Sequence, residues 1–253
     1  MASPRGRTDP HPGVSPLTMS LMPEHTSKQF DSELESVRSS VLRMGGLVEE
    51  QIMRAVESLA SGDMALIESV VDGDRLVNRM EVELDERCSH IVARRQPTAG
   101  DLRMLMTVVK MITDLERIGD EAQKVARMAR MIHEAERAHM PRVELAHIAD
   151  AAIEMLRKAL DSFARLDPIA AAQVVRDDIA LDDEYRAIVR QLITFMIEDP
   201  RTISRSIEIL TIVKALERIG DHAKNMCEYT VYMVKGRDVR HIDVEDLERE
   251  AAE

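Results

Sequence analysis

Apolar side chains recur along most of the chain at intervals of three and four residues, the spacing of one face of an α-helix. The first such run begins at Phe30 and continues to Leu59. Helix-breaking residues interrupt the pattern at Ser61-Gly62-Asp63, Pro97, Pro141, Pro168 and Pro200, because proline and glycine end helices. The pattern predicts six long helices, over residues 30–59, 64–95, 99–133, 143–165, 169–198 and 201–235, with Asp63 capping the second and Gly236 ending the last.

A hexapeptide occurs twice in this pattern. Residues 115–120 and 216–221 both read Leu-Glu-Arg-Ile-Gly-Asp, and each copy lies late in the third helix of a set of three. The second helix of each set carries a Val-Val pair, followed at matching spacing by Asp74 and Asn78 or by Asp178 and Asp182. Short connections make neighbouring helices antiparallel. The sequence therefore predicts an all-α fold of two tandem, pseudo-symmetric, antiparallel three-helix bundles.

The predicted bundles leave a segment at each end of the chain. Residues 1–26 contain five of the nine prolines and are expected to form a disordered tail. The first bundle is expected over residues 27–138 and the second over residues 139–236. The acidic residues 237–253 are expected to fray into solvent.

Composition supports a helical protein and argues against a nucleic-acid-binding protein and against a membrane-spanning one. Aromatic residues make up 2% of the chain, whereas methionine occurs 17 times, so aliphatic and thioether side chains must fill the core. A net charge of −12 without a run of Lys or Arg argues against nucleic-acid binding. No apolar stretch approaches the length needed to cross a bilayer. Cys88 and Cys227 are far apart and outside any metal-binding spacing, as expected for reduced, partly buried thiols in the cytoplasm.

The repeated hexapeptide places two carboxylates beside an apolar stripe. Residues four apart on a helix differ by about 40° around its axis, so Glu116 and Asp120 project from one side. Gly119 lies near the middle of the apolar stripe, about 60° from Glu116 and about 100° from Asp120. Glycine in a helix costs about 1 kcal/mol relative to alanine, so its presence here indicates close approach of a neighbour. Carboxylates at the border of a core repel each other unless a cation compensates. The neighbouring Arg117 points about 100° away from Glu116.

A bound metal ion is the predicted compensating cation. Carboxylate oxygens suit Mg, Mn, Ca or oxidised Fe. The predicted metal ligands are Glu116, Asp120, Glu217 and Asp221, with Asp74, Asn78, Asp178, Asp182 and His222 as possible additional ligands. His222 has no counterpart in the first repeat, where Glu121 stands.

No set of catalytic residues is evident, so we expect a protein that is not an enzyme. Glu144 and His147 form a single Glu-x-x-His in the opening turn of a predicted helix, whereas di-iron carboxylate bundles use two such pairs. Two alternatives remain open from the residues alone. One is a carboxylate-bridged metalloenzyme of the di-iron type, and the other is a purely structural helical scaffold whose carboxylates pair with Lys and Arg.

The sequence resembles the PhoU family of bacterial phosphate-uptake and phosphate-signalling regulators. The resemblance is carried by residues 30–34, 95–97, 101–103, 114–120 and 216–223 and by Asn225. It implies two three-helix bundles and metal clusters on Glu116, Asp120, Glu217 and Asp221, with Fe, Zn, Mn and Mg as candidate ions. It also implies a cytoplasmic negative regulator of the phosphate regulon.

The same resemblance implies protein partners. Family members are thought to link the ATPase subunit of the phosphate ABC transporter to a membrane sensor histidine kinase. This chain would then reach the membrane peripherally, through those partners. Because Met-rich helical faces often pair, we also expect a homodimer.

Overall fold

The computed structural model describes residues 28–134 and 140–253, and this part of the chain forms helices without a strand. The long helices are α1 (Lys28–Ser61), α2 (Met64–Arg95), α3 (Ala99–Glu134), α4 (Ala146–Arg165), α5 (Pro168–Glu198) and α6 (Ile203–Lys235). The predicted all-α fold is confirmed. A 3-10 turn, Pro200–Thr202, precedes α6, which therefore begins two residues later than predicted. The predicted disordered tail and the predicted boundary between residues 138 and 139 lie outside the described residues.

Capping interactions form several of the predicted helix ends. The Asp63 carboxylate accepts a hydrogen bond from the Ala65 backbone N–H at 2.8 Å and so caps α2. Asp167 caps α5 in the same way. Gly236 adopts the left-handed conformation, with φ 79°, and ends α6. These contacts satisfy backbone groups that a helix end leaves unpaired.

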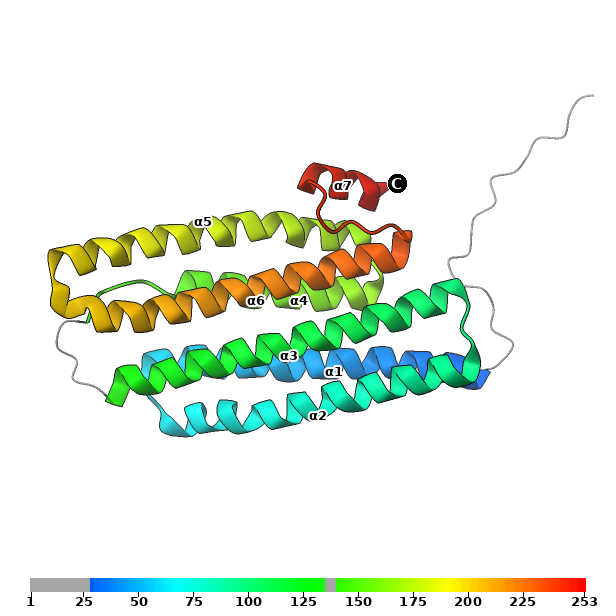
Figure 1. Ribbon diagram of the computed structural model, residues 1–253, viewed down its shortest axis with the longest axis horizontal. Helices are drawn as coiled ribbons and strands as arrows, with labels where there is room; N and C mark the ends of the chain where they lie inside the picture. Colours follow the sequence, from blue (N-terminus) through cyan, green and yellow to red (C-terminus); the bar gives the residue numbers. More distant parts are fainter. Residues whose placement is uncertain (1–27, 135–139) are drawn as a thin grey trace, which may run out of the picture.

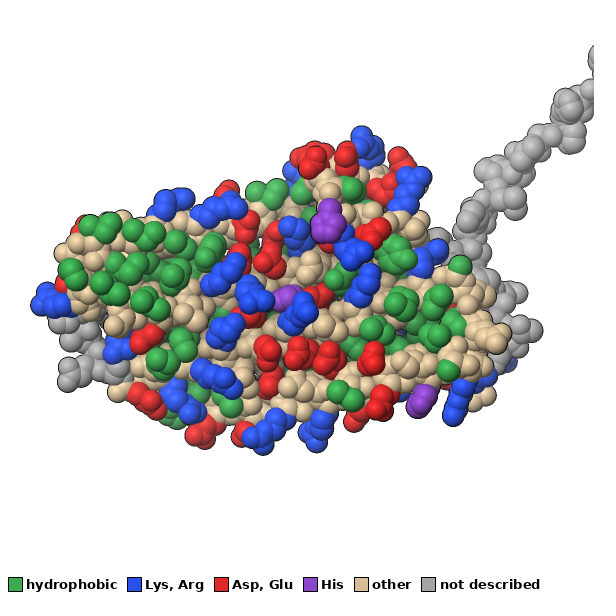
Figure 2. Space-filling view, viewed as in Figure 1, with side chains coloured by type: hydrophobic (Ala, Val, Ile, Leu, Met, Phe, Trp, Pro, Cys, Tyr) green, Lys and Arg blue, Asp and Glu red, His purple; other side chains and the backbone are tan. Residues whose placement is uncertain are grey.

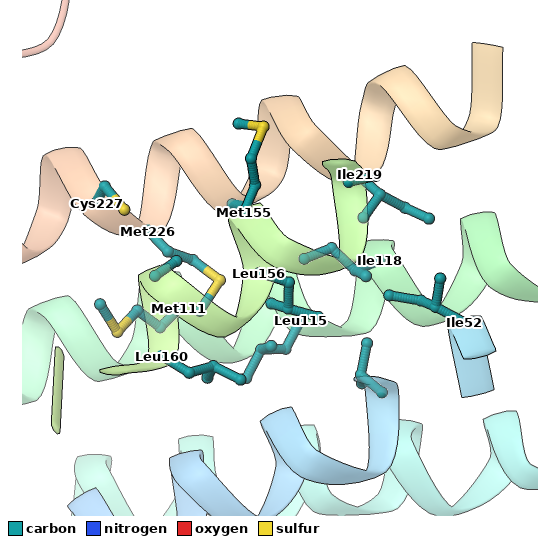
Figure 3. Packing of buried hydrophobic residues seen from close by; sticks show 14 of the residues in the cluster. Ile52, Met111, Leu115, Ile118, Met155, Leu156, Leu160, Ile219, Met226 and Cys227 are labelled. Atoms are coloured by element: carbon teal, nitrogen blue, oxygen red, sulfur yellow. The ribbon is translucent and has the colours of Figure 1, made fainter. Parts of the chain in front are cut away.

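The helices lie side by side in two sets of three (Figure 1), with α1, α2 and α3 in one set and α4, α5 and α6 in the other. The two sets meet where α3 packs along α6. Side chains from α3, α4 and α6 interdigitate there, including Leu115, Leu156 and Ile219 (Figure 3), and one hydrophobic cluster continues through both halves. The two sets therefore share a core.

Both cysteines lie inside this core, unpaired, as predicted. Burial raises the pKa of the Cys88 thiol to about 11 and raises that of the Cys227 thiol further. Both thiols therefore stay protonated at neutral pH and react slowly as nucleophiles.

The expectation that residues 237–253 fray into solvent is wrong. They contain a further helix, α7 (Val244–Ala252), which packs on α5 (Figure 1). Leu247 and Ala251 are buried, and Arg176 of α5 forms an ion pair with Glu248. The acidic composition hid a short amphipathic pattern in which Val244, Leu247 and Ala251 lie on one side of a helix.

None of the described helices combines the length and apolar character that a membrane span requires.

Candidate metal centre

The two motif glycines allow close approach at equivalent places in the two halves. A Cβ atom added to Gly119 would lie 3.3 Å from Gln51 Oε1 and 3.6 Å from Val77 Cγ1. A Cβ atom added to Gly220 would lie 3.4 Å from Met155 Sδ and would overlap Leu181. The predicted close approach at both glycines is therefore present, and its partners are side chains of the first and second helices of each half.

The first carboxylate cluster lies between α2 and α3. Asp74 and Glu81 come from α2, and Glu116 and Asp120 come from α3. Burial raises the pKa of Asp74 and the charge of Asp120 raises it further, while the hydrogen bond from Asn78 and the charge of Arg127 lower it. Burial also raises the pKa of Glu116, followed by the charges of Asp120, Glu81 and Asp74. Acidic side chains gather along the middle of α3 on the face shown in Figure 2.

Several oxygen atoms in this first cluster are buried and lack a hydrogen-bond donor. Among the described residues, these atoms are Gln51 Oε1, Asp74 Oδ1 and Asn78 Oδ1. Asn78 uses its amide Nδ2 to donate to Asp74 Oδ2 at 3.3 Å. Within residues 28–134 and 140–253, no Lys or Arg forms an ion pair with Asp74, Glu81, Glu116 or Asp120. Unpaired buried acceptors beside carboxylates that lack an ion pair fit an oxygen-liganded cation.

The second cluster lies between α5 and α6 and contains lysines. Lys214 Nζ donates to Glu217 Oε2 at 2.5 Å, and Lys224 Nζ donates to Asp178 Oδ2 at 2.7 Å. Burial raises the pKa of Asp221, as do the charges of Glu217 and Asp178, while both lysines lower it. Lys and Arg side chains cover the middle of α6 in Figure 2.

Two of the possible additional ligands face other partners. Asp182 pairs with Arg186 at 2.9 Å. The ring of His222 is buried at the junction of the two halves, where its Nδ1 lies 2.7 Å from Asp114 Oδ1. The structure therefore brings His222 to α3 rather than to the carboxylates of its own repeat.

The described carboxylates do not converge on a common point as the ligands of a metal ion do. No three Asp, Glu, His or Cys side chains among them converge closely enough to hold an ion. A bound cation would therefore require side-chain rotation in either cluster. Glu144 and His147 stand apart from both clusters, since Glu144 accepts from the Ala146 N–H and His147 pairs with Glu184 at the surface.

Sequence reasoning missed Gln51, Glu81, Lys214 and Lys224. Gln51 could have been found as a polar residue inside the apolar stripe, between Val48 and Ile52. Lys214 could have been found because it lies one helical turn before Glu217, where opposite charges meet. Lys224 and Glu81 reach the clusters from positions that only helix packing defines.

A pH-dependent stability is expected from Glu228 on α6. Burial raises its pKa from the ordinary value of 4.5 to about 7, although Lys224 and Arg240 lower it. Between these values the folded state holds a proton that the unfolded chain has lost. The free energy of unfolding therefore falls as pH rises from about 4.5 to about 7 and then levels off. Glu228→Gln should stabilise the protein by about 1–2 kcal/mol at pH 8, after allowance for solvent screening, and leave it unchanged near pH 4.

Urea unfolding of both proteins at pH 4, 6 and 8 measures this difference. Glu248→Gln is the control, because the hydrogen bond from Arg176 lowers the pKa of Glu248, so that variant should lose stability at pH 8. An equal pH dependence in the wild type and Glu228→Gln would contradict the prediction.

The fold and the repeated motif define a duplicated helical-bundle protein with one carboxylate cluster in each half. The chain belongs to the PhoU family: the family model described as PhoU domain matches residues 41–129 and 145–230. A phosphate-specific transport system accessory protein PhoU homolog from Pseudomonas putida is 47% identical over 89% of this chain and 88% of its own length. The Escherichia coli (strain K12) accessory protein PhoU is 44% identical over 89% of this chain and 93% of its own.

Solved structures agree with this assignment. The crystal structure of PhoU from Pseudomonas aeruginosa superposes with a TM-score of 0.79 at 47% identity and covers 83% of this chain and 100% of that chain. The phosphate transport system regulatory protein PhoU from Streptococcus pneumoniae gives a TM-score of 0.77 at 27% identity, with 83% and 99% covered. The relatives are named accessory and regulatory proteins rather than enzymes, in line with the expectation from the missing catalytic set.

Proposed function

We propose that this protein is a PhoU-type adaptor that negatively regulates phosphate uptake and the phosphate regulon. The observation that carries the proposal is the 47% identity, over 89% of the chain, to a phosphate-specific transport accessory protein. The adaptor links the ATPase subunit of the phosphate ABC transporter to a sensor histidine kinase, in the cytoplasm, where transporter ATPases use ATP. It reaches the membrane peripherally through these partners.

The surface supports binding to proteins. Apolar side chains gather over the end of the molecule where α5 meets α6 (Figure 2). The exposed residues there include Ile193, Ile197, Ile203 and Ile207, and Ile197 is 77% exposed. Contiguous exposed apolar surface is typical of protein-interaction sites. We also propose that the protein forms a homodimer.

Deletion of the gene is expected to raise alkaline phosphatase output severalfold in cells grown with abundant phosphate. The reason is that a negative regulator keeps the kinase inactive under that condition. Alkaline phosphatase activity at high and low phosphate measures the effect, with re-expression of the wild-type chain as the control. Unchanged output at high phosphate would contradict the regulatory role.

Pull-down assays test the linkage itself. The purified chain is expected to retain the transporter ATPase and the cytoplasmic part of the kinase. Both assays are carried out at high and low phosphate, with an unrelated ABC-transporter ATPase as control. The absence of a complex with either partner at both concentrations would refute the adaptor role, even if deletion alters alkaline phosphatase output.

We also propose that the adaptor binds a divalent or trivalent metal ion, with Fe, Zn, Mn and Mg as candidates. Two observations support this: the unpaired oxygens of Gln51, Asp74 and Asn78, and the raised pKa values of Asp74 and Glu116. When bound, the ion supplies positive charge among these carboxylates. The expected result is that Glu116→Gln/Asp120→Asn lowers the metal content of the purified protein by elemental analysis. Arg165→Gln/Asp161→Asn, which removes an exposed ion pair on α4, is the control.

The two alternatives are less well supported. A di-iron enzyme needs ligands from four helices at one centre, whereas the candidate carboxylates come from α2 and α3 in one half and from α5 and α6 in the other. A structural scaffold would pair its carboxylates with Lys and Arg, and only the second cluster does so. Unchanged metal content in both Glu116→Gln/Asp120→Asn and Glu217→Gln/Asp221→Asn would favour the scaffold.

A further inference from the structure

We propose that the two carboxylate clusters have different roles: the first binds the cation with Gln51 as an additional ligand, and the second holds Lys214 and Lys224 instead of a cation. The proposal rests on the metal binding proposed above and specifies which half provides it. It follows from comparing the side chains that surround Gly119 with those that surround Gly220.

Gln51 of α1 is held between two glycines of the neighbouring helices. A Cβ atom on Gly73 of α2 would lie 2.8 Å from Gln51 Nε2, and a Cβ atom on Gly119 of α3 would lie 3.3 Å from Gln51 Oε1. The side chain is 7% exposed, so its amide group is enclosed. Two glycines together thus create the space that this amide occupies.

The oxygen of this amide and a second unpaired oxygen both lie near Gly119. Gln51 Oε1 and Asp74 Oδ1 lie 3.3 and 3.7 Å from the same added Cβ position on Gly119, and neither accepts a hydrogen bond among the described residues. A buried acceptor without a partner destabilises the fold by about 1–3 kcal/mol unless a donor or a cation satisfies it. Amide and carboxylate oxygens are ligands that hard divalent cations accept together. Asn78 Oδ1, one helical turn after Asp74, is the third unpaired oxygen.

The equivalent positions in the second half lack these ligands. Met155 of α4 stands where the first half has Gln51, since each packs against the motif glycine of its own half. Leu181 likewise corresponds to Val77, so apolar atoms surround Gly220. A thioether is a soft ligand and does not suit a cation that prefers oxygen.

The second half contains positive charges of its own. Lys214 and Lys224 occupy the sequence positions that Thr113 and Gln123 occupy relative to the motif in the first half. Lys214 binds both oxygens of Glu217, at 2.6 and 2.5 Å, and Lys224 binds Asp178 at 2.7 Å. In contrast, Thr113 donates to Glu81, and Gln123 donates to a backbone carbonyl of α2. These uncharged side chains leave the first cluster without a lysine, and among the described residues its nearest positive charges, Arg117 and Arg127, form no ion pair with it.

A Mn²⁺ titration of the full-length protein, followed by electron paramagnetic resonance of the free ion, tests the proposal. The wild type is expected to show one class of tight sites that disappears in Glu116→Gln/Asp120→Asn and persists in Glu217→Gln/Asp221→Asn. Gln51→Met, which introduces the residue of the second half, should weaken Mn²⁺ binding at least tenfold. Circular dichroism verifies that each variant is folded, and Met155→Leu is the matched control for substitution beside a motif glycine.

The reverse substitution tests the role of the lysines. Lys214→Thr/Lys224→Gln introduces the residues of the first half and should create a second class of Mn²⁺ sites. Lys124→Gln, which removes a lysine paired with Glu121 outside either cluster, should not.

Three results would overturn the proposal. Equal loss of Mn²⁺ from the two carboxylate double variants would show equivalent halves, and the proposed metal binding would then stand without this difference. Unchanged binding in Gln51→Met would show that the amide only fills the space between the glycines. If the wild type binds neither Mn²⁺ nor Fe, Zn or Mg, the metal binding itself fails, and this inference fails with it.

Discussion

Truncation of Leu115 to alanine is expected to lower the free energy of unfolding by about 3 kcal/mol. Leu115 is fully buried on α3, close to the junction with α6, and side chains of α4 pack near it (Figure 3). The variant loses the transfer free energy of the removed carbon atoms and leaves a cavity that the rigid helices around it cannot fill. Both halves contribute to this core, so the loss should destabilise the whole protein.

Urea denaturation followed by circular dichroism measures the effect. Leu102→Ala is the matched control, because Leu102 lies on the same helix but is 39% exposed, and its truncation should cost less than about 1 kcal/mol. A single transition that shifts for Leu115→Ala and remains in place for Leu102→Ala is the expected result. Two separate transitions, of which only one shifts in Leu115→Ala, would contradict the shared core.

Substitution of Asp114 by leucine is expected to destabilise the protein by about 3 kcal/mol. Asp114 of α3 is buried against His222 of α6, and its Oδ1 also accepts from Asn225 Nδ2 at 3.5 Å. Tyr229 lies near the same carboxyl, whose charge, after burial, raises the pKa of the phenol. Removal of the carboxylate leaves these buried groups unpaired where the two halves meet, and an unpaired buried group costs more than its hydrogen bond contributes.

The double variant Asp114→Leu/His222→Leu distinguishes the loss of the Asp114–His222 pair from a change in packing. Replacing both members of a buried pair by apolar residues is often close to neutral, so the double variant should recover part of the stability that Asp114→Leu loses. Thermal unfolding of the wild type, both single variants and the double variant provides the complete cycle. Additive losses from the two single variants would show that Asp114 and His222 do not act as a pair.

The long helices were predictable because each is long enough for its apolar period to be read without knowledge of its neighbours. Asp63 and Gly236 mark their ends with local chemistry, and the structure confirms both caps. The helix α7 was missed because it is short and its buried residues, Leu247 and Ala251, are separated by charged side chains. In such a segment, packing on α5 rather than local periodicity provides most of the stability.

The candidate site was predictable only in part. The repeat identified Glu116 and Glu217 as equivalent, and their helical spacing placed each with its aspartate at the border of the core. Their surroundings differ in part for a local reason, since Lys214 lies one helical turn before Glu217 on the same helix. Lys214 pairs with Glu217, whereas the structure places no lysine against Glu116 among the described residues.

By itself, the sequence determined the helical class, the duplication and the two acidic motifs, because these depend on residue order within single helices. Only the tertiary structure showed that Gln51 of α1 and Asp74 of α2 both lie beside Gly119, and that His222 of α6 reaches Asp114 of α3. Those pairs join residues from different helices, 23 positions or more apart in the sequence. Their meeting depends on the rotation and offset of packed helices, which local periodicity does not encode.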